Sequence, residues 1–217
     1  MLLINFKTYP QAGGLKALQL TRVLSEAAKD YPRVAIGFAP PALELAEVAR
    51  HGDSPIWAQH LDPVSSGQRT GFLSPADAKA AGAVGTFLNH SEHPLDPKTI
   101  QRTLELAVNE ELKVLLFAGD PRKVAQLSRL SPDFIAYEPP ELIGGKISVT
   151  SAKAETIKKA VEAAGRIPLL IGAGVHERLD ITATLSLGAI GAVVSSAVVT
   201  APDPKKIFAG LLSGFGT

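Results

Sequence analysis

The feature that most restricts the fold of this chain is a repeated alternation of short apolar runs with segments of helical periodicity. The runs are continuously apolar rather than alternating, which is typical of parallel strands covered by helices. The predicted strands lie near residues 2–7, 34–39, 56–59, 86–89, 113–117, 134–137, 168–171 and 192–194. The predicted helices lie near residues 15–30, 42–50, 75–81, 97–110, 121–130, 152–164, 177–187 and 204–212, and several open with a capping residue or a first-turn proline.

Eight strand–helix pairs within 217 residues predict an α/β protein with a compact (β/α)8 barrel. An open, doubly wound sheet would show the same alternation and is the alternative. The chain is 46% hydrophobic and 20% charged, enough to bury a substantial core. We find no linker or low-complexity segment, so residues 1–217 are expected to form a single domain.

Composition excludes several classes of function. The formal net charge is +1 and there is no long run of like charges, so neither nucleic acid nor an anionic membrane is an expected partner. There is no cysteine, which excludes disulfides and thiolate chemistry. No signal peptide and no apolar run of about 20 residues is visible, so we expect a soluble, cytoplasmic protein.

The residues that follow the predicted strands form a chemical set, because all strands of a barrel end at the same mouth. Lys7 follows the first strand, His90 the fourth and Glu138 the sixth. Pro139 steers Glu138 into an extended conformation, so its carboxylate should project from the strand end. A stiff double proline and Gly144-Gly145 flank the next loop, which we interpret as a lid over Glu138. Lys113 instead opens its strand and should lie at the opposite end.

Small residues follow the last two predicted strands, namely Gly172-Ala-Gly174 and Ser195-Ser196. Loops in these positions form the recurrent phosphate site of (β/α)8 barrels, and their backbone N–H groups can approach an anion. A metal site of His60, His90 and Asp62 is a weaker alternative, since no convincing further ligand accompanies them. The three other histidines, His51, His93 and His176, give no signal.

Taken together, four motifs resemble the triosephosphate isomerase family in the shorter form typical of archaea. They are Asn5-x-Lys7, Asn-His90-Ser-Glu92, Ala-Tyr-Glu138-Pro-Pro-Glu-Leu-Ile-Gly144 and the paired phosphate loops, and they occur in family order along the whole chain. The resemblance implies interconversion of dihydroxyacetone phosphate and glyceraldehyde 3-phosphate through an enediolate, without a cofactor or a metal.

The resemblance also implies a role for each matching residue. Glu138 would be the catalytic base, His90 the electrophile and Lys7 a cation that binds substrate. Ser91 and Glu92 would support the site. The remaining implied substrate contacts are Asn5, Ile143, Gly144, Gly172, Gly174, Ser195 and Ser196.

Two departures from the family pattern and three rival functions remain open. Gly144-Gly145-Lys146 stands where the family lid has Gly-Thr-Gly, and His93-Pro94 stands where the longer form has an arginine. A Schiff-base aldolase would need a lysine inside the barrel, and a metal-dependent sugar-phosphate epimerase would need a full ligand set. The third rival is a catalytically silent barrel that acts as a binding protein.

The segment 63–73 is longer than closure of a barrel requires. The family's corresponding loop docks beside the active site of a neighbouring subunit, and Thr70 matches the residue at its tip. The resemblance therefore implies a homodimer formed through residues 63–73, with a tetramer as the alternative assembly.

Overall fold

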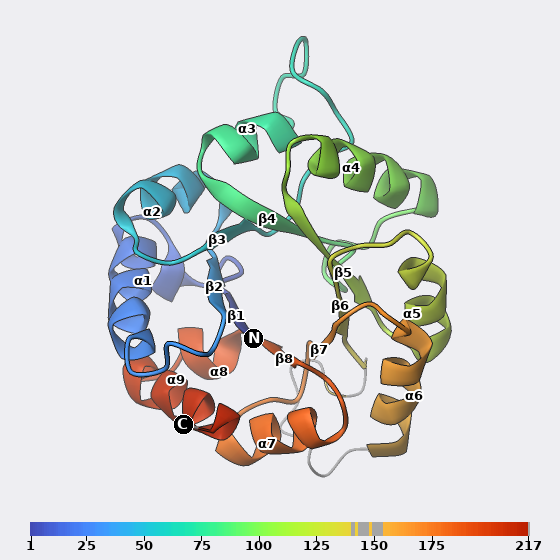
Figure 1. Cartoon of the computed structure of the whole chain (residues 1–217). Coiled ribbons are helices and arrows are strands. Elements are labelled where there is room, and N and C mark those ends of the chain that lie inside the picture. The colour runs from blue at the N-terminus through green and yellow to red at the C-terminus, as the bar shows by residue number, and fades with distance from the viewer. Residues whose placement is uncertain (140–141, 143–147, 149–153, 217) are drawn as a thin grey trace.

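The computed structural model describes residues 1–139, 142, 148 and 154–216, and within them it shows a closed parallel barrel. Strands β1 to β8 pair in chain order, and the pairing of β8 with β1 closes the ring. Helices form an outer ring around the strands (Figure 1). The predicted (β/α)8 barrel is confirmed, and closure excludes the open sheet.

The strands are β1 (Leu2–Asn5), β2 (Ile36–Ala39), β3 (Ile56–Ala58), β4 (Ala83–Leu88), β5 (Lys113–Ala118), β6 (Phe134–Tyr137), β7 (Leu169–Ile171) and β8 (Gly191–Val194). The α-helices are α1 (Leu15–Ala28), α2 (Leu45–His51), α3 (Pro75–Ala80), α4 (Pro97–Asn109), α5 (Pro121–Ser128), α6 (Ala154–Ala164), α7 (Arg178–Ser186), α8 (Ser196–Val199) and α9 (Pro204–Leu212). Short 3-10 helices span Pro10–Ala12 (η1), Ala42–Glu44 (η2) and Ser213–Phe215 (η4). None of the helices in the described part of the chain is long and apolar enough to cross a membrane.

Helix starts follow the predicted chemistry. Four helices begin with proline directly after a Ser or Asp whose side chain accepts a backbone N–H of the first turn; these capping residues are Ser74, Asp96, Asp120 and Asp203. Proline suits this position because its missing N–H would have no partner within the helix. The short helix α8 was not predicted, since four residues show no helical period.

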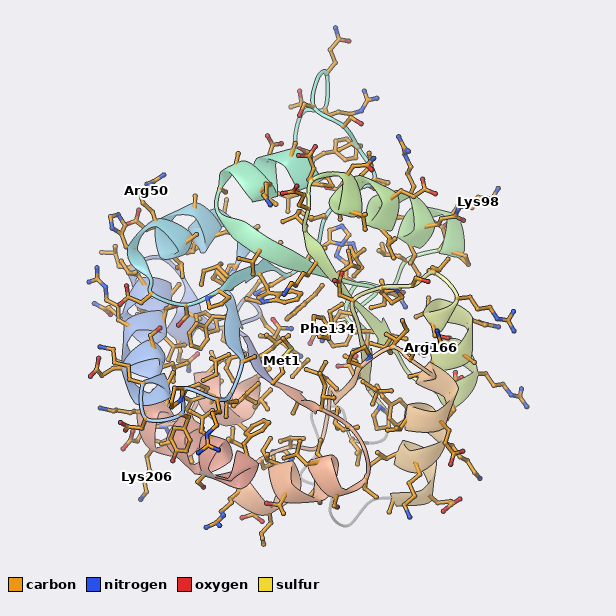
Figure 2. The ribbon with its side chains drawn as sticks, viewed as in Figure 1. Met1, Arg50, Lys98, Phe134, Arg166 and Lys206 are labelled. Carbon is orange, nitrogen blue, oxygen red and sulfur yellow. The ribbon has the colours of Figure 1, made fainter. Side chains whose placement is uncertain are left out.

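The strands divide their side chains between two apolar layers. Leu2 and Ile4 of β1 pack in the layer between sheet and helices, whereas Leu3 faces the barrel lumen. The lumen layer consists of Leu3, Ala39, Trp57, Phe87, Leu115, Phe117, Ala136, Leu170 and Val193. Figure 2 shows Met1 and Phe134 near the barrel axis and long charged side chains such as Arg50 and Lys98 at the periphery.

Trp57 fills one end of the lumen, which we call the floor, and two glycines make room for it. A Cβ on Gly37 would lie 2.8 Å from the indole nitrogen, and a Cβ on Gly85 would lie 2.6 Å from the indole ring. The Trp57 ring also meets those of Phe87 and Phe134, with centroids 5.8 and 6.1 Å away. The strand β4 begins at Ala83, earlier than the predicted start near residue 86. The prediction began too late because glycine is uncommon inside strands. Here Trp57 occupies the space that a side chain at Gly85 would fill.

Candidate active site

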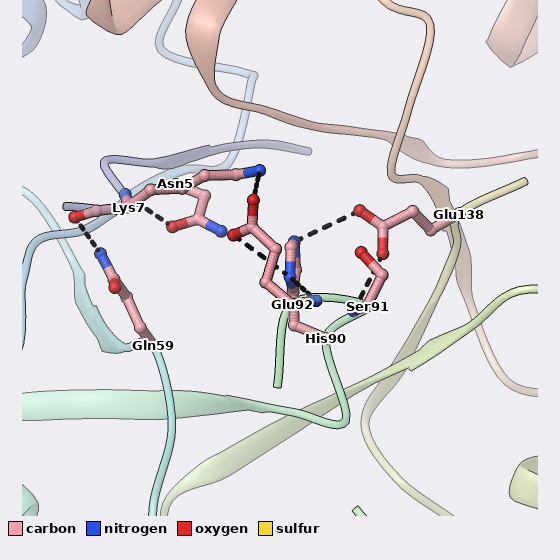
Figure 3. Close-up of polar contacts among 7 residues, drawn as sticks. All are labelled: Asn5, Lys7, Gln59, His90, Ser91, Glu92 and Glu138. Atoms are coloured by element: carbon pink, nitrogen blue, oxygen red, sulfur yellow. Dashed lines mark hydrogen bonds and ion pairs between the residues drawn. The ribbon is translucent and has the colours of Figure 1, made fainter. Parts of the chain in front are cut away.

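The barrel brings the predicted polar residues together at the carboxyl ends of its strands, which we call the mouth (Figure 3). Asn5 ends β1, His90 lies two residues beyond β4, and Glu138 follows β6 directly. Together with Lys7 they line a single cavity of about 190 Å³. The same cavity is lined by Gly172, Gly174, Ser195 and Ser196 from the loops after β7 and β8.

Lys7 occupies a left-handed backbone conformation, with φ of 47°, which is uncommon for a residue with a side chain. Two contacts hold it there: its N–H donates to Asn5 Oδ1 at 3.0 Å, and its carbonyl accepts from Gln59 Nε2 at 3.0 Å. The ammonium group then lies 2.7 Å from Glu92 Oε1. Asn5 therefore orients the backbone of Lys7, and Glu92 orients its ammonium group.

The surroundings of His90 indicate which nitrogen of its imidazole ring carries the hydrogen. The N–H of Glu92 donates to Nδ1 at 3.1 Å, so Nδ1 must accept. A neutral ring then carries its hydrogen on Nε2, which lies 3.2 Å from Glu138 Oε1. Phe117 packs edge-on against the ring, with centroids 4.7 Å apart. The geometry therefore suits a neutral imidazole that donates from Nε2.

Glu138 is almost completely buried, with 5% of its surface exposed. Its Oε2 accepts the Ser91 N–H at 3.2 Å. Burial raises the pKa of Glu138, but the hydrogen bond from His90 and the hydrogen bonds from Ser91 lower it by more. The net pKa lies below the ordinary 4.5, so the carboxylate is ionised near neutral pH.

Gly172 lies against the base of the Glu138 side chain, since a Cβ on Gly172 would be 3.3 Å from the Glu138 Cβ. Gly174 adopts a positive φ of 73°. Ser196 and Ala197 begin α8, and their N–H groups have no carbonyl to bond within that helix. Ile143 and Gly144 lie outside the described residues, whereas Leu142 is described and lines the cavity.

Comparison with known proteins identifies the family. The sequence model of the triosephosphate isomerase family matches residues 1–211. The chain belongs to the triosephosphate isomerase family. Triosephosphate isomerase of Methanopyrus kandleri is 37% identical over 98% of this chain and 96% of its own length. That of Saccharolobus solfataricus is 39% identical over 95% and 92% of the two chains.

A solved structure supports the fold independently. The crystal structure of triosephosphate isomerase from Bartonella henselae covers 100% of this chain and 98% of its own, with a TM-score of 0.76 and 19% sequence identity. This likeness supports the barrel fold of the chain.

Two further residues at the mouth, Gln59 and Asn89, end predicted strands but were given no role from the sequence. Gln59 Nε2 bridges the carbonyls of Lys7 and Ala39 at 3.0 and 2.9 Å. Asn89 adopts φ of 60°, donates to the Phe117 carbonyl at 2.9 Å and accepts the Leu95 N–H at 2.9 Å. Asparagine tolerates left-handed backbone better than most residues, so its place directly before His90 was a usable signal.

The structure also describes the surroundings of His60 and Asp62, which were the weaker alternative of a metal site. His60 stacks on His93, with ring centroids 3.9 Å apart, and its Nε2 lies 3.5 Å from Asp62 Oδ1. Burial lowers the pKa of His60, and His93 lowers it further, against the opposing effect of Asp62. Within the described ranges, no three His, Asp or Glu side chains form a group able to hold a metal ion.

Proposed function

We propose that this aldose–ketose isomerase interconverts dihydroxyacetone phosphate and D-glyceraldehyde 3-phosphate with Glu138 as base, His90 as electrophile and Lys7 as substrate-binding cation. The observation that carries the proposal is the 3.2 Å contact between His90 Nε2 and Glu138 Oε1 on the wall of one cavity. The contact supports the proposal because a buried carboxylate and an imidazole donor this close together can both act on one small substrate. Lys7 lines the same cavity.

The proton transfer follows from this arrangement. Glu138 takes the proton from the carbon beside the carbonyl; the electron pair of that C–H bond forms the carbon–carbon double bond, and the π pair of the carbonyl moves onto its oxygen. The Nε2–H of His90 and the ammonium of Lys7 stabilise the resulting enediolate. The protonated Glu138 then returns the proton to the neighbouring carbon. A proton passes from the hydroxyl oxygen of the enediolate to the former carbonyl oxygen, beside Nε2 of His90, so that the carbonyl re-forms at the other carbon. When substrate binds, its oxygen must replace Glu138 as the acceptor of the hydrogen bond from His90 Nε2.

The loops after β7 and β8 are the proposed binding region for the substrate phosphate. Gly174, Ser195 and Ser196 line the cavity that also holds Glu138 and His90. Gly172 leaves room for the Glu138 side chain. Ile143, Gly144 and Asn5 complete the proposed substrate contacts, with Ser91 and Glu92 as supports.

A coupled assay of triose phosphate isomerisation, with and without a chelator, tests the proposal. We expect turnover that the chelator leaves unchanged, because the proposed steps use only protein groups. Turnover abolished by the chelator would favour a metal-dependent epimerase. Tight binding of triose phosphate without turnover would favour a silent barrel.

We also propose that the chain forms a two-fold homodimer through residues 63–73, with a tetramer as the alternative, and acts in the cytoplasm on glycolytic triose phosphates. The segment projects from the barrel between β3 and α3 (Figure 1). Its base is tied by the Asp62 N–H to the Leu73 carbonyl at 2.8 Å and by the Leu73 N–H to Asp62 Oδ2 at 2.7 Å. Phe72 remains 50% exposed, which favours burial against a partner.

Substitution at the loop tip tests this assembly. Thr70→Arg should force a bulky charge into the partner's surface and shift the protein to monomer. Sedimentation equilibrium measures the mass, with Gln19→Arg on the exposed side of α1 as the matched control. An unchanged mass and intact activity in Thr70→Arg would contradict the interface.

A further inference from the structure

His176 lies where the active-site cavity meets a second hollow, although its position in the sequence gave no sign of a role. It lines the cavity of Glu138 and His90, and also an adjoining cavity of about 580 Å³ beside α8 and α9. The two cavities share His176, Ser196 and Ala197 as lining residues. The imidazole therefore lies at the rim of the region proposed for phosphate.

The backbone of His176 is fixed by a buried carboxylate. Asp180 is fully buried in the first turn of α7, and its Oδ2 accepts the N–H of His176 at 2.8 Å and that of Glu177 at 3.1 Å. Its other oxygen, Oδ1, accepts the Ser148 hydroxyl. The residue that carries the imidazole is thus held by buried polar contacts, as a binding group requires.

Two side-chain atoms near this rim are buried and have no hydrogen-bond partner among the described residues. One is His176 Nε2 and the other is Ser195 Oγ, from the loop after the neighbouring strand. A buried polar atom without a partner is unfavourable and is rare in folded proteins. Both atoms can donate a hydrogen bond, and both residues line the active-site cavity.

We infer that His176 is a specificity-determining residue whose Nε2–H, together with the Ser195 hydroxyl, donates hydrogen bonds to the phosphate oxygens of the substrate. The inference rests on the proposed function and adds to it a side chain that belongs to none of the sequence motifs from which the site was predicted. A dianionic phosphomonoester fits because its oxygens only accept hydrogen bonds, whereas the two unpartnered groups can donate. Because His176 lies at the phosphate end, it contributes to binding rather than to proton transfer.

Steady-state kinetics of His176→Ala and His176→Gln test this role at fixed pH. In His176→Ala we expect KM for triose phosphate to rise on the order of 10-fold with kcat nearly unchanged, as for loss of a hydrogen bond present in ground and transition states alike. Glutamine can place an N–H donor near the position of Nε2, so His176→Gln should recover most of the affinity. A purely structural role would give no such rescue. His51→Ala, at an exposed position of α2, is the matched control and should match the unmodified chain.

Binding of inorganic phosphate supplies a readout that does not depend on turnover. Titration of the intact protein should shift the 15N resonance of His176 Nε2, and His176→Ala should weaken phosphate binding by a factor similar to its rise in KM. An unmoved resonance, or unchanged KM and phosphate affinity in His176→Ala, would overturn the inference. If the unmodified chain binds phosphate through His176 but shows no isomerisation, the proposed function fails and the phosphate contact stands.

Discussion

The two ends of the barrel lumen use opposite physical strategies. At the floor, Trp57 packs against Phe87 and Phe134, and glycines on β2 and β4 leave room for its ring. At the mouth, Lys7 and Asn89 adopt left-handed backbone conformations and Glu138 is buried as a charge. The floor gains stability from close apolar packing. The mouth holds conformations and buried charges that are unfavourable in themselves and have value only for binding and chemistry.

The contrast suggests why the mouth can carry this strain. Its unusual conformations are each held by specific side-chain hydrogen bonds, from Asn5 and Gln59 around Lys7 and from the Asn89 side chain to Phe117 and Leu95. These partners are attached to strands whose other side chains pack in the apolar layers. We therefore expect substitutions at the mouth to change catalysis and substitutions at the floor to change stability.

The largest effect should come from shortening the proposed base. Glu138→Asp moves the carboxylate back by one methylene, away from the substrate carbon, and should lower kcat by roughly 10²-fold or more. The fold should persist, because Asp preserves the buried charge. Steady-state kinetics measure the loss of kcat, and thermal unfolding of the same sample measures whether the fold persists. Near-normal turnover would remove Glu138 from its proposed role.

The matching change at the floor is Gly85→Ala. The new Cβ would lie 2.6 Å from both the Trp57 ring and the Lys113 carbonyl, so the floor must shift. Overpacking of this kind lowers the free energy of unfolding by about 1–3 kcal/mol. Chemical denaturation measures the loss, and kcat of the folded fraction should stay normal. A large loss of kcat with normal stability would contradict the division of roles.

Gly172→Ala makes the same chemical change at the mouth, and it should lower activity more than stability. Its Cβ would lie 3.3 Å from the Glu138 Cβ, close enough to displace that side chain by a few tenths of an ångström. We expect kcat/KM to fall roughly 10-fold, since the base must remain aligned with its substrate. Stability should change less than in Gly85→Ala. If Gly172→Ala unfolds more readily than Gly85→Ala at unchanged activity, the comparison is wrong.

Much of the fold could be predicted because it depends on local patterns. The eight apolar runs and the capping residues before Pro75, Pro97, Pro121 and Pro204 are visible in the sequence. The mouth residues Lys7, His90 and Glu138 followed from strand ends, because parallel strands share one orientation. Their roles in catalysis stay predictions.

What could not be predicted depends on contacts between distant parts of the chain. Gly85 lies within β4, and the space beside it is filled by Trp57, which is 28 positions away in the sequence. The bridge from Gln59 to the Lys7 carbonyl joins residues 52 positions apart. His176 gave no signal, because an unpartnered Nε2 is a property of its surroundings rather than of any motif.

The smallest effect concerns the acid side of the pH profile. Because the pKa of Glu138 lies below 4.5, the folded state favours its carboxylate form. The resulting stabilisation is fully present above the ordinary value of 4.5 and is lost as pH falls through the lower pKa of the folded protein. The Glu138 carboxyl group of the free protein should therefore titrate below pH 4.5, which 13C NMR of that group measures.

Removal of the imidazole should reverse this shift. In His90→Ala, burial would act on Glu138 against only the Ser91 hydrogen bonds, so the pKa should rise. The same 13C NMR titration of the Glu138 carboxyl group measures this rise without relying on turnover, with Gly85→Ala as a floor control in which the pKa stays low. A Glu138 titration midpoint above 4.5 in the unmodified chain, or an unmoved midpoint in His90→Ala, would show that the two side chains are not coupled as their 3.2 Å contact indicates.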